Sequence, residues 1–433
     1  MTVCAIDSPS AGTDDRSPER GCVLTADGAY AARLARNGDS WFPERWTLDG
    51  PEPYAVPLPG NQPEEPGTEL QPLADGRVLI HRRAGVRHLF ALLYPTGPGT
   101  GELPLGAMEC AGPGVRLGLL PPAPGGARAY AVTVGPRGSA VWQVAGGPGG
   151  PERLVEVPGR CSGGVWLDRA GRLLALDREL EGCVKTVVVD LERGEVTPLL
   201  QITPGSDDRL LMADPDSGLL LISSDAPSPG RARLGWGVLG STLPVRFPTS
   251  LRLPECTAVP FAIQPGQVLE PESCGVALRI EGPVGTWVGV WRPAERRVRH
   301  VAAPKGWLAG SGLWTAEGVL RLPYSTRETP CGVAELRAPA AEPRTEAGGG
   351  GGTAGGTGGT GTVCGTGGTG AGGAAPDRGA REAGTERGAR EAGTACGAPG
   401  EEIAEAADPG SAEPAPPRAV PLAQAPLGRL VTN

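Results

Sequence analysis

The sequence predicts an all-β fold built from seven repeated four-stranded units, and three observations support this prediction. A tight turn that contains glycine recurs along the first 337 of the 433 residues, and a tryptophan recurs in one of the strand-like segments that follow it. Short runs rich in valine and leucine flank the turns, which is typical of strands, and helical patterns are scarce in this part of the chain.

The glycine turns set the length of the repeat. Seven turns are centred on Gly28, Gly76, Gly126, Gly171, Gly218, Gly266 and Gly318, at intervals of 48, 50, 45, 47, 48 and 52 residues. Glycine readily adopts the positive φ that two-residue hairpin turns require. A repeat of this length is close to that of a propeller blade, so it indicates one repeat architecture rather than several separate domains.

The unit around Gly171 shows the four expected strands most clearly. They are the segments GGVWLD, LLALDREL, KTVVVDLE and VTPLLQI. The segments that follow Gly76 and Gly126 have the same plan. Seven units of this kind predict a seven-bladed β-propeller over residues 20–337, in which each blade buries both faces against its neighbours.

Tryptophan is the second repeating feature. Trp46, Trp142, Trp236 and Trp291 fall in the third predicted strand of their units, at intervals of 96, 94 and 55 residues, close to two, two and one repeats. Large aromatic side chains bury well between layers. We therefore interpret these tryptophans as core residues between adjacent blades rather than as ligand-stacking residues.

The composition changes sharply near residue 338. Residues 346–373 are almost entirely glycine, threonine and alanine, and the octet RGAREAGT then occurs twice. Such a segment has too little apolar surface to offset its chain entropy, so we expect residues 338–417 to be a disordered insertion in the last blade. The seventh unit lacks a fourth strand before it. Residues 418–428 resemble VTPLLQI and are predicted to close blade 7, with the N-terminal segment TVCAID as the alternative.

Charge and composition exclude several classes of protein. The net charge of −8 argues against nucleic-acid binding, which usually needs a basic surface. No stretch approaches the roughly 18 apolar residues of a membrane span, and the first residues lack the features of a secretory signal. We therefore expect a cytoplasmic protein that does not bind membranes. The ten cysteines form no CxxC pair, so we expect free thiols and no metal or cofactor.

Three of the turn segments carry a family resemblance. TADGAYAARL, LADGRVLIHR and DRAGRLLALD resemble the Asp-Gly repeats of WD40-like and TolB-type propellers, over about residues 20–337. This resemblance implies the propeller fold. The sequence has neither the Trp-Asp ending nor the Gly-His start of WD40 repeats, so no functional residue is carried over from that family.

The residues needed for the catalytic chemistry of known propellers are scarce. There is no G-x-S-x-G pentapeptide, and the only histidines are His81, His88 and His300, so no Ser-His-Asp triad is predicted. The three asparagines cannot supply metal ligands from around a ring, although a carboxylate calcium site stays open. The leading hypothesis is a non-catalytic scaffold or binding module for a protein or small-molecule partner, acting as a monomer. The alternative is a hydrolase or lyase that uses carboxylates around the central channel.

Loops at one face of a rigid ring are the natural binding surface. The polar loops 177–179, 206–209 and 327–328 and the arginines beside the 81–88 hairpin are expected there, with exposed aromatic side chains at Trp41 and Trp307. No catalytic residue is predicted. The candidate binding residues are Trp41, Arg82, Arg83, Arg178, Glu179, Asp207, Asp208, Arg209, Trp307 and Arg327.

Two further groups have alternative interpretations. His81 and His88 flank the segment HRRAGVRH, which we interpret as a solvated charged turn, with a metal pair or an anion site as alternatives. Seven cysteines are expected at that same face, since each lies at the entry to a first strand or between the second and third strands of its unit. We interpret them as small hydrophobic residues, with metal or redox chemistry as the alternative. They are Cys22, Cys110, Cys161, Cys183, Cys256, Cys274 and Cys331.

Overall fold

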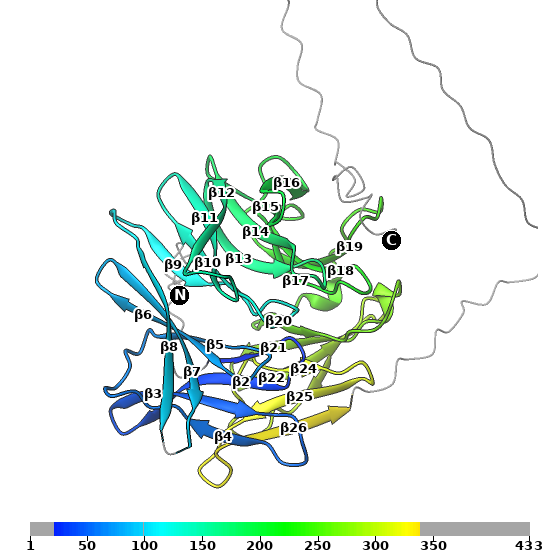
Figure 1. The fold of residues 1–433 in the computed structure, drawn as a ribbon. Coiled ribbons are helices and arrows are strands. Elements are labelled where there is room, and N and C mark those ends of the chain that lie inside the picture. Colours follow the sequence, from blue (N-terminus) through cyan, green and yellow to red (C-terminus); the bar gives the residue numbers. More distant parts are fainter. Residues whose placement is uncertain (1–20, 98, 338–433) are drawn as a thin grey trace, which may run out of the picture. The chain divides into compact units, whose positions relative to one another are not determined.

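A computed structural model describes residues 21–97 and 99–337 of the chain. These residues form seven antiparallel sheets that follow one another in chain order around a common centre, as Figure 1 shows. Each sheet is one blade. The predicted all-β, seven-bladed propeller is therefore confirmed. The predicted insertion at 338–417 and the predicted closing strand at 418–428 lie outside the described residues.

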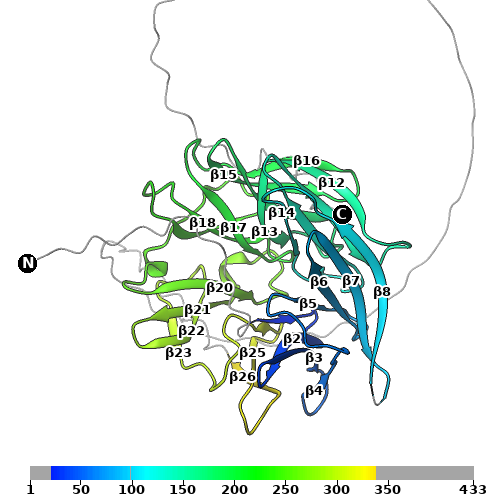
Figure 2. The same ribbon diagram turned by 90° about the vertical axis from the view of Figure 1, so that its left-hand side faces the viewer.

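The first four blades each contain four strands, and Figure 2 shows those of blade 2 from the side. Blade 1 consists of β1 (Cys22–Leu24), β2 (Tyr30–Asn37), β3 (Ser40–Thr47) and β4 (Tyr54–Pro57), and blade 2 of β5 (Glu69–Pro72), β6 (Val78–Ala84), β7 (Arg87–Pro95) and β8 (Thr100–Glu109). Blade 3 consists of β9 (Arg116–Leu119), β10 (Ala129–Val134), β11 (Gly138–Ala145) and β12 (Glu152–Pro158), and blade 4 of β13 (Arg160–Trp166), β14 (Leu173–Leu180), β15 (Cys183–Asp190) and β16 (Glu195–Leu200).

The last three blades are less regular. Blade 5 consists of β17 (Asp208–Ala213), β18 (Leu219–Ser224) and β19 (Arg233–Val238), and blade 6 of β20 (Thr257–Ile263), β21 (Val276–Gly282), β22 (Gly285–Trp291) and β23 (Arg299–Val301). Blade 7 consists, among the described residues, of β24 (Leu313–Trp314), β25 (Val319–Tyr324) and β26 (Gly332–Arg337). In blade 5, Trp236 of β19 and Arg246 form two backbone hydrogen bonds of 2.9 Å. These bonds lie at the edge of β19 where a fourth strand would pair.

Helices are minor features of the described residues. The 3-10 turns η2 (Thr249–Leu251) and η3 (Pro271–Ser273) each span three residues. Within the described part of the chain, no helix has the length and apolar character needed to cross a bilayer.

All seven predicted glycines occupy the turn between the first and second strands of a blade. Their φ angles range from 64° at Gly126 to 81° at Gly318, which an L side chain adopts only with strain. The turns of adjacent blades also touch. The Ala74 amide donates to the Gly126 carbonyl at 2.9 Å, and a Cβ at Gly126 would lie 2.6 Å from that of Ala74. Glycine therefore fixes both the turn and the spacing between blades 2 and 3.

The four recurring tryptophans lie in the third strands, as predicted. Trp46 in β3, Trp236 in β19 and Trp291 in β22 are buried, and Trp142 in β11 is half-buried. Trp236 and Trp291 belong to one apolar cluster that joins blades 5 and 6. The interpretation of these residues as core between blades is confirmed.

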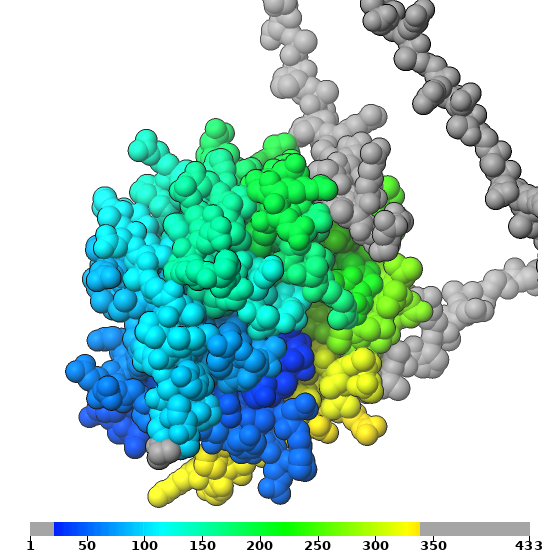
Figure 3. Space-filling view, in the orientation of Figure 1, coloured from blue at the N-terminus to red at the C-terminus, as the bar shows by residue number. Residues whose placement is uncertain are grey.

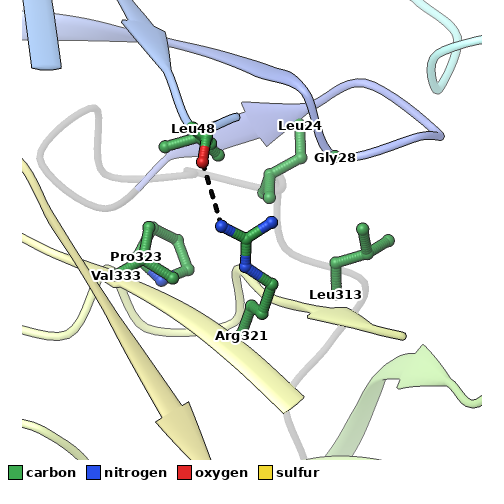
Figure 4. A pocket seen from close by; sticks show the side chains of 7 residues that line it. All are labelled: Leu24, Gly28, Leu48, Leu313, Arg321, Pro323 and Val333. Atoms are coloured by element: carbon green, nitrogen blue, oxygen red, sulfur yellow. Dashed lines mark hydrogen bonds between the residues drawn. The ribbon is translucent and has the colours of Figure 1, made fainter. Parts of the chain in front are cut away.

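Side-chain contacts close the ring between blade 7 and blade 1. The Ser311 hydroxyl donates to the Cys22 carbonyl at 2.7 Å. Arg321 donates to the Leu48 carbonyl at 2.9 Å, as Figure 4 shows. In the space-filling view of Figure 3, the blue first blade touches the yellow last blade. A shallow apolar hollow remains at this seam, lined by Leu24, Gly28, Leu48, Leu313, Arg321, Pro323 and Val333.

Candidate functional site

The antiparallel topology gives the ring two distinct ends. The glycine turns lie at one end, here called the glycine-turn end. The connections that lead into each first strand, and those between the second and third strands, lie at the opposite end, here called the entry end. All ten predicted binding residues lie in or beside entry-end connections. Half of them, Arg178, Glu179 and the run Asp207–Arg209, come from the adjacent blades 4 and 5.

Asp208 is a structural residue rather than a binding residue. Its carboxylate is completely buried and accepts hydrogen bonds from Lys185 Nζ (2.7 Å), Ser206 Oγ (2.9 Å), Ser224 Oγ (2.7 Å) and the Ile202 amide (2.8 Å). Both oxygens are occupied by donors from blades 4 and 5. The sequence prediction for Asp208 is therefore corrected: this side chain is inaccessible to a ligand and ties the two blades together.

The neighbouring loop is held in place as well. Asp207 is exposed, but its Oδ1 accepts a hydrogen bond of 2.9 Å from the Val184 amide in blade 4. Its own amide donates to Asp225 Oδ1 at 2.8 Å. Hydrogen bonds to Val184 in blade 4 and to Asp225 in blade 5 thus hold the loop that leads into blade 5, which makes the surface around it rigid.

Asp177, at the entry end of β14, is only half satisfied. Its Oδ1 accepts hydrogen bonds from Thr186 Oγ1 (2.8 Å) and from the Leu210 amide (3.0 Å). Within the described residues, no hydrogen bond reaches its Oδ2. The side chain is 6% exposed, and this burial raises the pKa of the carboxyl above its usual value. Oδ2 is not among the enclosed side-chain atoms that lack a partner, so it is the accessible oxygen of an otherwise buried residue.

A glycine bulge leaves room for this open oxygen. The pairing of β13 with β14 shifts between Ser162 and Val165, at Gly163 and Gly164, whose φ angles are 72° and 144°. A Cβ at Gly163 would lie 3.3 Å from Asp177 Oδ2. The bulge is on a first strand, and first strands of adjacent blades contact one another, so they line the centre of the ring. Oδ2 thus faces the exposed Gly163 at the entry end.

Arg209 brings a positive charge to the same place. The half-buried guanidinium donates from Nη1 to Ser162 Oγ at 3.3 Å. Burial raises the pKa of Asp177, and the nearby Arg209 charge acts in the opposite direction. No ion pair joins the two side chains among the described residues. We call the group Ser162, Gly163, Asp177 and Arg209 the blade 4 site.

Arg178 and Glu179 do not share this site. Side chains alternate along a strand, so Arg178 lies on the opposite face of β14 from Asp177, paired with Cys161. Glu179 is exposed beyond it. Asp177 lies in one of the polar loops expected at this face from the sequence, but it was not among the predicted binding residues. The signal that could have identified it is the Gly163-Gly164 pair inside a strand, since glycine there often marks a bulge or a close approach.

The predicted residues of blades 1 and 2 form a separate group. Arg82 is ion-paired with Glu64 (2.7 Å) and Glu102 (2.6 Å), and these bonds hold the pKa of its guanidinium above the usual range. Trp41 is half-buried, contrary to the expected exposed aromatic. Arg83 is exposed and donates to the Gly85 carbonyl at 3.2 Å. With two carboxylates, Arg82 supports the fold rather than a free anion site.

The blade 7 residues also differ from expectation. Trp307 is half-buried: its Nε1 donates to the Ser311 carbonyl at 2.8 Å, and its ring packs against Phe261 with 5.4 Å between centroids. It is therefore a packing residue rather than the exposed aromatic that was expected. Arg327 is exposed in the connection between β25 and β26. Neither residue is brought into the blade 4 site.

The two predicted hairpin histidines are buried, so their interpretation as part of a solvated turn is wrong. His81 Nδ1 bonds Glu69 at 2.8 Å, and His81 Nε2 bonds His88 Nδ1 at 2.7 Å, with the rings stacked 5.0 Å apart. Glu69 also accepts from the Leu119 amide of blade 3 at 3.1 Å. The described residues contain no group of three or more side chains suited to holding a metal ion.

Five of the described cysteines have thiols that are harder to ionise than usual. Burial raises the pKa of Cys22 and Cys331 to about 12 and that of Cys274 to about 11, and it also raises the pKa of Cys110 and Cys161. A raised pKa disfavours the thiolate, which is the form that binds metals and reacts with oxidants, and this argues against the metal or redox alternative for these five cysteines. Cys274 lies between β20 and β21, at the glycine-turn end. The prediction of seven cysteines at one face is therefore wrong for Cys274.

The geometry of the described residues defines the class of the chain, a seven-bladed β-propeller. No protein-family model matches the sequence, and no curated protein matches it. Among solved structures, the chain is similar to TolB from Acinetobacter baumannii, with 12% identity and a TM-score of 0.40 over 72% of this chain and 81% of that one. TolB-type propellers, which the Asp-Gly repeats resemble, are thus among the neighbours in structure.

Two propeller domains from other proteins are similar to about the same degree. The β-propeller domain of Cps50 (Swd1) from Myceliophteria thermophila is 13% identical, with a TM-score of 0.44 over 73% of this chain and 96% of that one. The β-propeller domain of the Trilobed protease from Pyrococcus furiosus is 9% identical, with a TM-score of 0.44 over 72% of this chain and 93% of that one. These likenesses concern the fold alone.

Proposed function

We propose that the chain is a non-catalytic binding module that holds a segment of a partner protein against the entry end of blades 4 and 5. The observation that carries this proposal is the blade 4 site, where the open Oδ2 of Asp177 faces an exposed glycine bulge beside Arg209. The proposal also takes the protein to be a cytoplasmic monomer.

The rigidity of the surroundings supports this function. Asp208 joins blades 4 and 5 through buried hydrogen bonds, and Asp207 fixes the loop beside Arg209. Polar groups that are already held in place lose little entropy when a partner binds. Binding sites are commonly built in this way, from loops on a rigid scaffold.

Affinity purification of the full chain from its native cells tests the proposal. Arg209→Gln removes the positive charge of the site, and Arg128→Gln is the matched control, since Arg128 is an exposed arginine beside the glycine turn of blade 3. We expect a stoichiometric partner with the wild type and the control. Its recovery should fall about tenfold or more with Arg209→Gln, the effect of losing a charged hydrogen bond. Equal recovery with both variants, or no stoichiometric partner, contradicts the proposal.

One observation favours a second candidate function, a hydrolase or lyase that uses channel carboxylates. Burial raises the pKa of Asp177, and a carboxyl with a raised pKa is better suited to general acid or base chemistry than an ordinary one. A broad screen of hydrolase and lyase substrates with the wild type and with Asp177→Asn tests this candidate. Turnover that disappears in the variant supports it. Turnover that persists in the variant, or no turnover by the wild type, removes it.

A further inference from the structure

We infer that the blade 4 site recognises a peptide group of an extended segment, with Asp177 Oδ2 accepting from its N–H and Arg209 and Ser162 donating to its carbonyl. This inference rests on the proposed function and adds the chemical group that is bound. Four properties of the site lead to it: an acceptor, a set of donors, opposite charges and open space.

The acceptor is Asp177 Oδ2. The Thr186 hydroxyl and the Leu210 amide both donate hydrogen bonds to Oδ1, which fixes the orientation of the carboxylate. No donor among the described residues reaches Oδ2. The residue as a whole is buried, but Oδ2 is not among the enclosed side-chain atoms without a partner, so this oxygen can be reached from solvent. An N–H supplied by a bound segment satisfies this oxygen.

The donors are Arg209 and Ser162. Arg209 directs Nη1 to Ser162 Oγ, and its other N–H groups have no partner within the described residues. Because Ser162 Oγ accepts this bond, its hydroxyl hydrogen points elsewhere and can donate. Ser162 is exposed and Arg209 half-buried, so both can be reached from the entry end.

The opposite charges select a neutral ligand group. A cation drawn to Asp177 is repelled by Arg209, and an anion drawn to Arg209 is repelled by Asp177. A neutral group with both a donor and an acceptor matches both residues at once. The peptide group has this character and is present at every position of a partner's chain except at proline.

The space comes from Gly163. Its exposed backbone lies on the inner strand of blade 4, and a side chain there would press on Oδ2, since even a Cβ would lie at 3.3 Å. A partner's backbone needs this close approach, because a peptide N–H bonds an oxygen at about 2.9 Å. The bulge therefore gives a main-chain group access to the carboxylate.

A random peptide library displayed on phage and selected against the full-length chain provides the probe. The affinities of the selected peptides are then measured by calorimetry for the wild type, Asp177→Asn, Arg209→Gln and the control Arg128→Gln. In Asp177→Asn, the Thr186 and Leu210 donors keep the amide oxygen in the Oδ1 position, so the NH₂ group takes the position of Oδ2. We expect binding about ten- to a hundredfold weaker for Asp177→Asn and Arg209→Gln and unchanged for Arg128→Gln.

N-methylation of the peptides, one amide at a time, identifies the recognised group. One methylated position should weaken binding to the wild type and cause no further loss with Asp177→Asn, because both changes remove the same hydrogen bond. Thermal melting of each variant confirms that it is folded. Peptides that bind Asp177→Asn and Arg209→Gln as tightly as the wild type overturn the inference while leaving the proposed function standing. Selection of no peptide overturns it too, and recovery of the native partner then decides the proposed function separately.

Discussion

At the scale of single residues, two aspartates of blades 4 and 5 show how neighbours decide the role of a side chain. Asp208 meets four donors and is closed to solvent, whereas Asp177 meets two donors on a single oxygen. The sequence predicted polar residues at this end of the ring. It could not distinguish these two, because the donors to each come from other strands and loops, and the Leu210 amide that bonds Asp177 comes from the next blade.

Asp177→Asn should stabilise the fold at neutral pH. Burial raises the pKa of this carboxyl above the ordinary 3.8, so the native state holds the proton up to a higher pH than the unfolded state does. The stabilising contribution of that proton is complete below the unfolded pKa and is lost as the pH rises through the folded pKa. Urea unfolding between about pH 4 and pH 8 measures the effect. The advantage of the variant should grow as the pH rises from about 4 through the folded pKa and then level off, and a difference that is independent of pH contradicts the assignment.

The His81–His88 pair should make the fold sensitive to mild acid. The pKa of His88 is lowered by burial first, then by the charges of His81 and Arg83, with Glu69 acting in the opposite direction. The unfolded chain therefore binds more protons below its histidine pKa of about 6.5, and stability falls as the pH drops from there towards the folded pKa.

His88→Gln tests this prediction, because it removes the titrating group and keeps a polar side chain. Between pH 7 and pH 5, the wild type should lose more unfolding free energy than the variant. Parallel losses would show that other groups govern the acid response.

At the scale of elements, the strands and turns were predictable because they depend on local sequence. Valine- and leucine-rich runs became strands, and each recurring glycine became a turn with positive φ. The sequence predicted that adjacent blades pack against each other, but it did not predict which side chains form the contacts. Contacts such as Trp236 with the Trp291 cluster, or Arg209 with Ser162, join residues far apart in the chain.

The turn glycine of blade 3 should be more sensitive to substitution than a turn glycine in open space. Gly126 and Gly194 have similar φ angles of 64° and 70°, but a Cβ at Gly126 meets Ala74 at 2.6 Å and one at Gly194 meets nothing within 4 Å. Gly194→Ala should cost about 1–2 kcal/mol from backbone strain alone. Gly126→Ala should cost about 1–3 kcal/mol more, from overpacking against blade 2. Urea unfolding of the two variants compares them, and equal costs would mean that the contact between the turns contributes nothing.

At the scale of the whole molecule, the number of blades followed from counting turns, whereas the closure of the ring did not. The seam between blades 7 and 1 is held by Ser311 on the Cys22 carbonyl and by Arg321 on the Leu48 carbonyl. The two residues of each contact are 289 and 273 positions apart in the sequence, respectively. No pattern in the local sequence predicts contacts between residues so far apart.

The predicted fourth strand of blade 7 leads to a deletion test. Removal of Gly348–Pro417 should leave the melting temperature nearly unchanged, because this segment has little apolar surface to bury. Removal of Ala419–Leu427 in addition should lower it by several degrees, since blade 7 would lose a strand that covers the edge of β26. An equal loss in both deletions means that the glycine-rich segment is structural, and no loss in either means that residues 418–428 do not complete the blade.

The most direct test of the whole account is a crystal structure of the chain with a library-selected peptide bound. The account predicts seven sheets around one axis, with the peptide at the entry end of blades 4 and 5, one of its N–H groups within hydrogen-bonding distance of Asp177 Oδ2, and the neighbouring carbonyl facing Arg209. A different number of sheets, or a peptide that binds at the glycine-turn end and leaves Asp177 untouched, would contradict it.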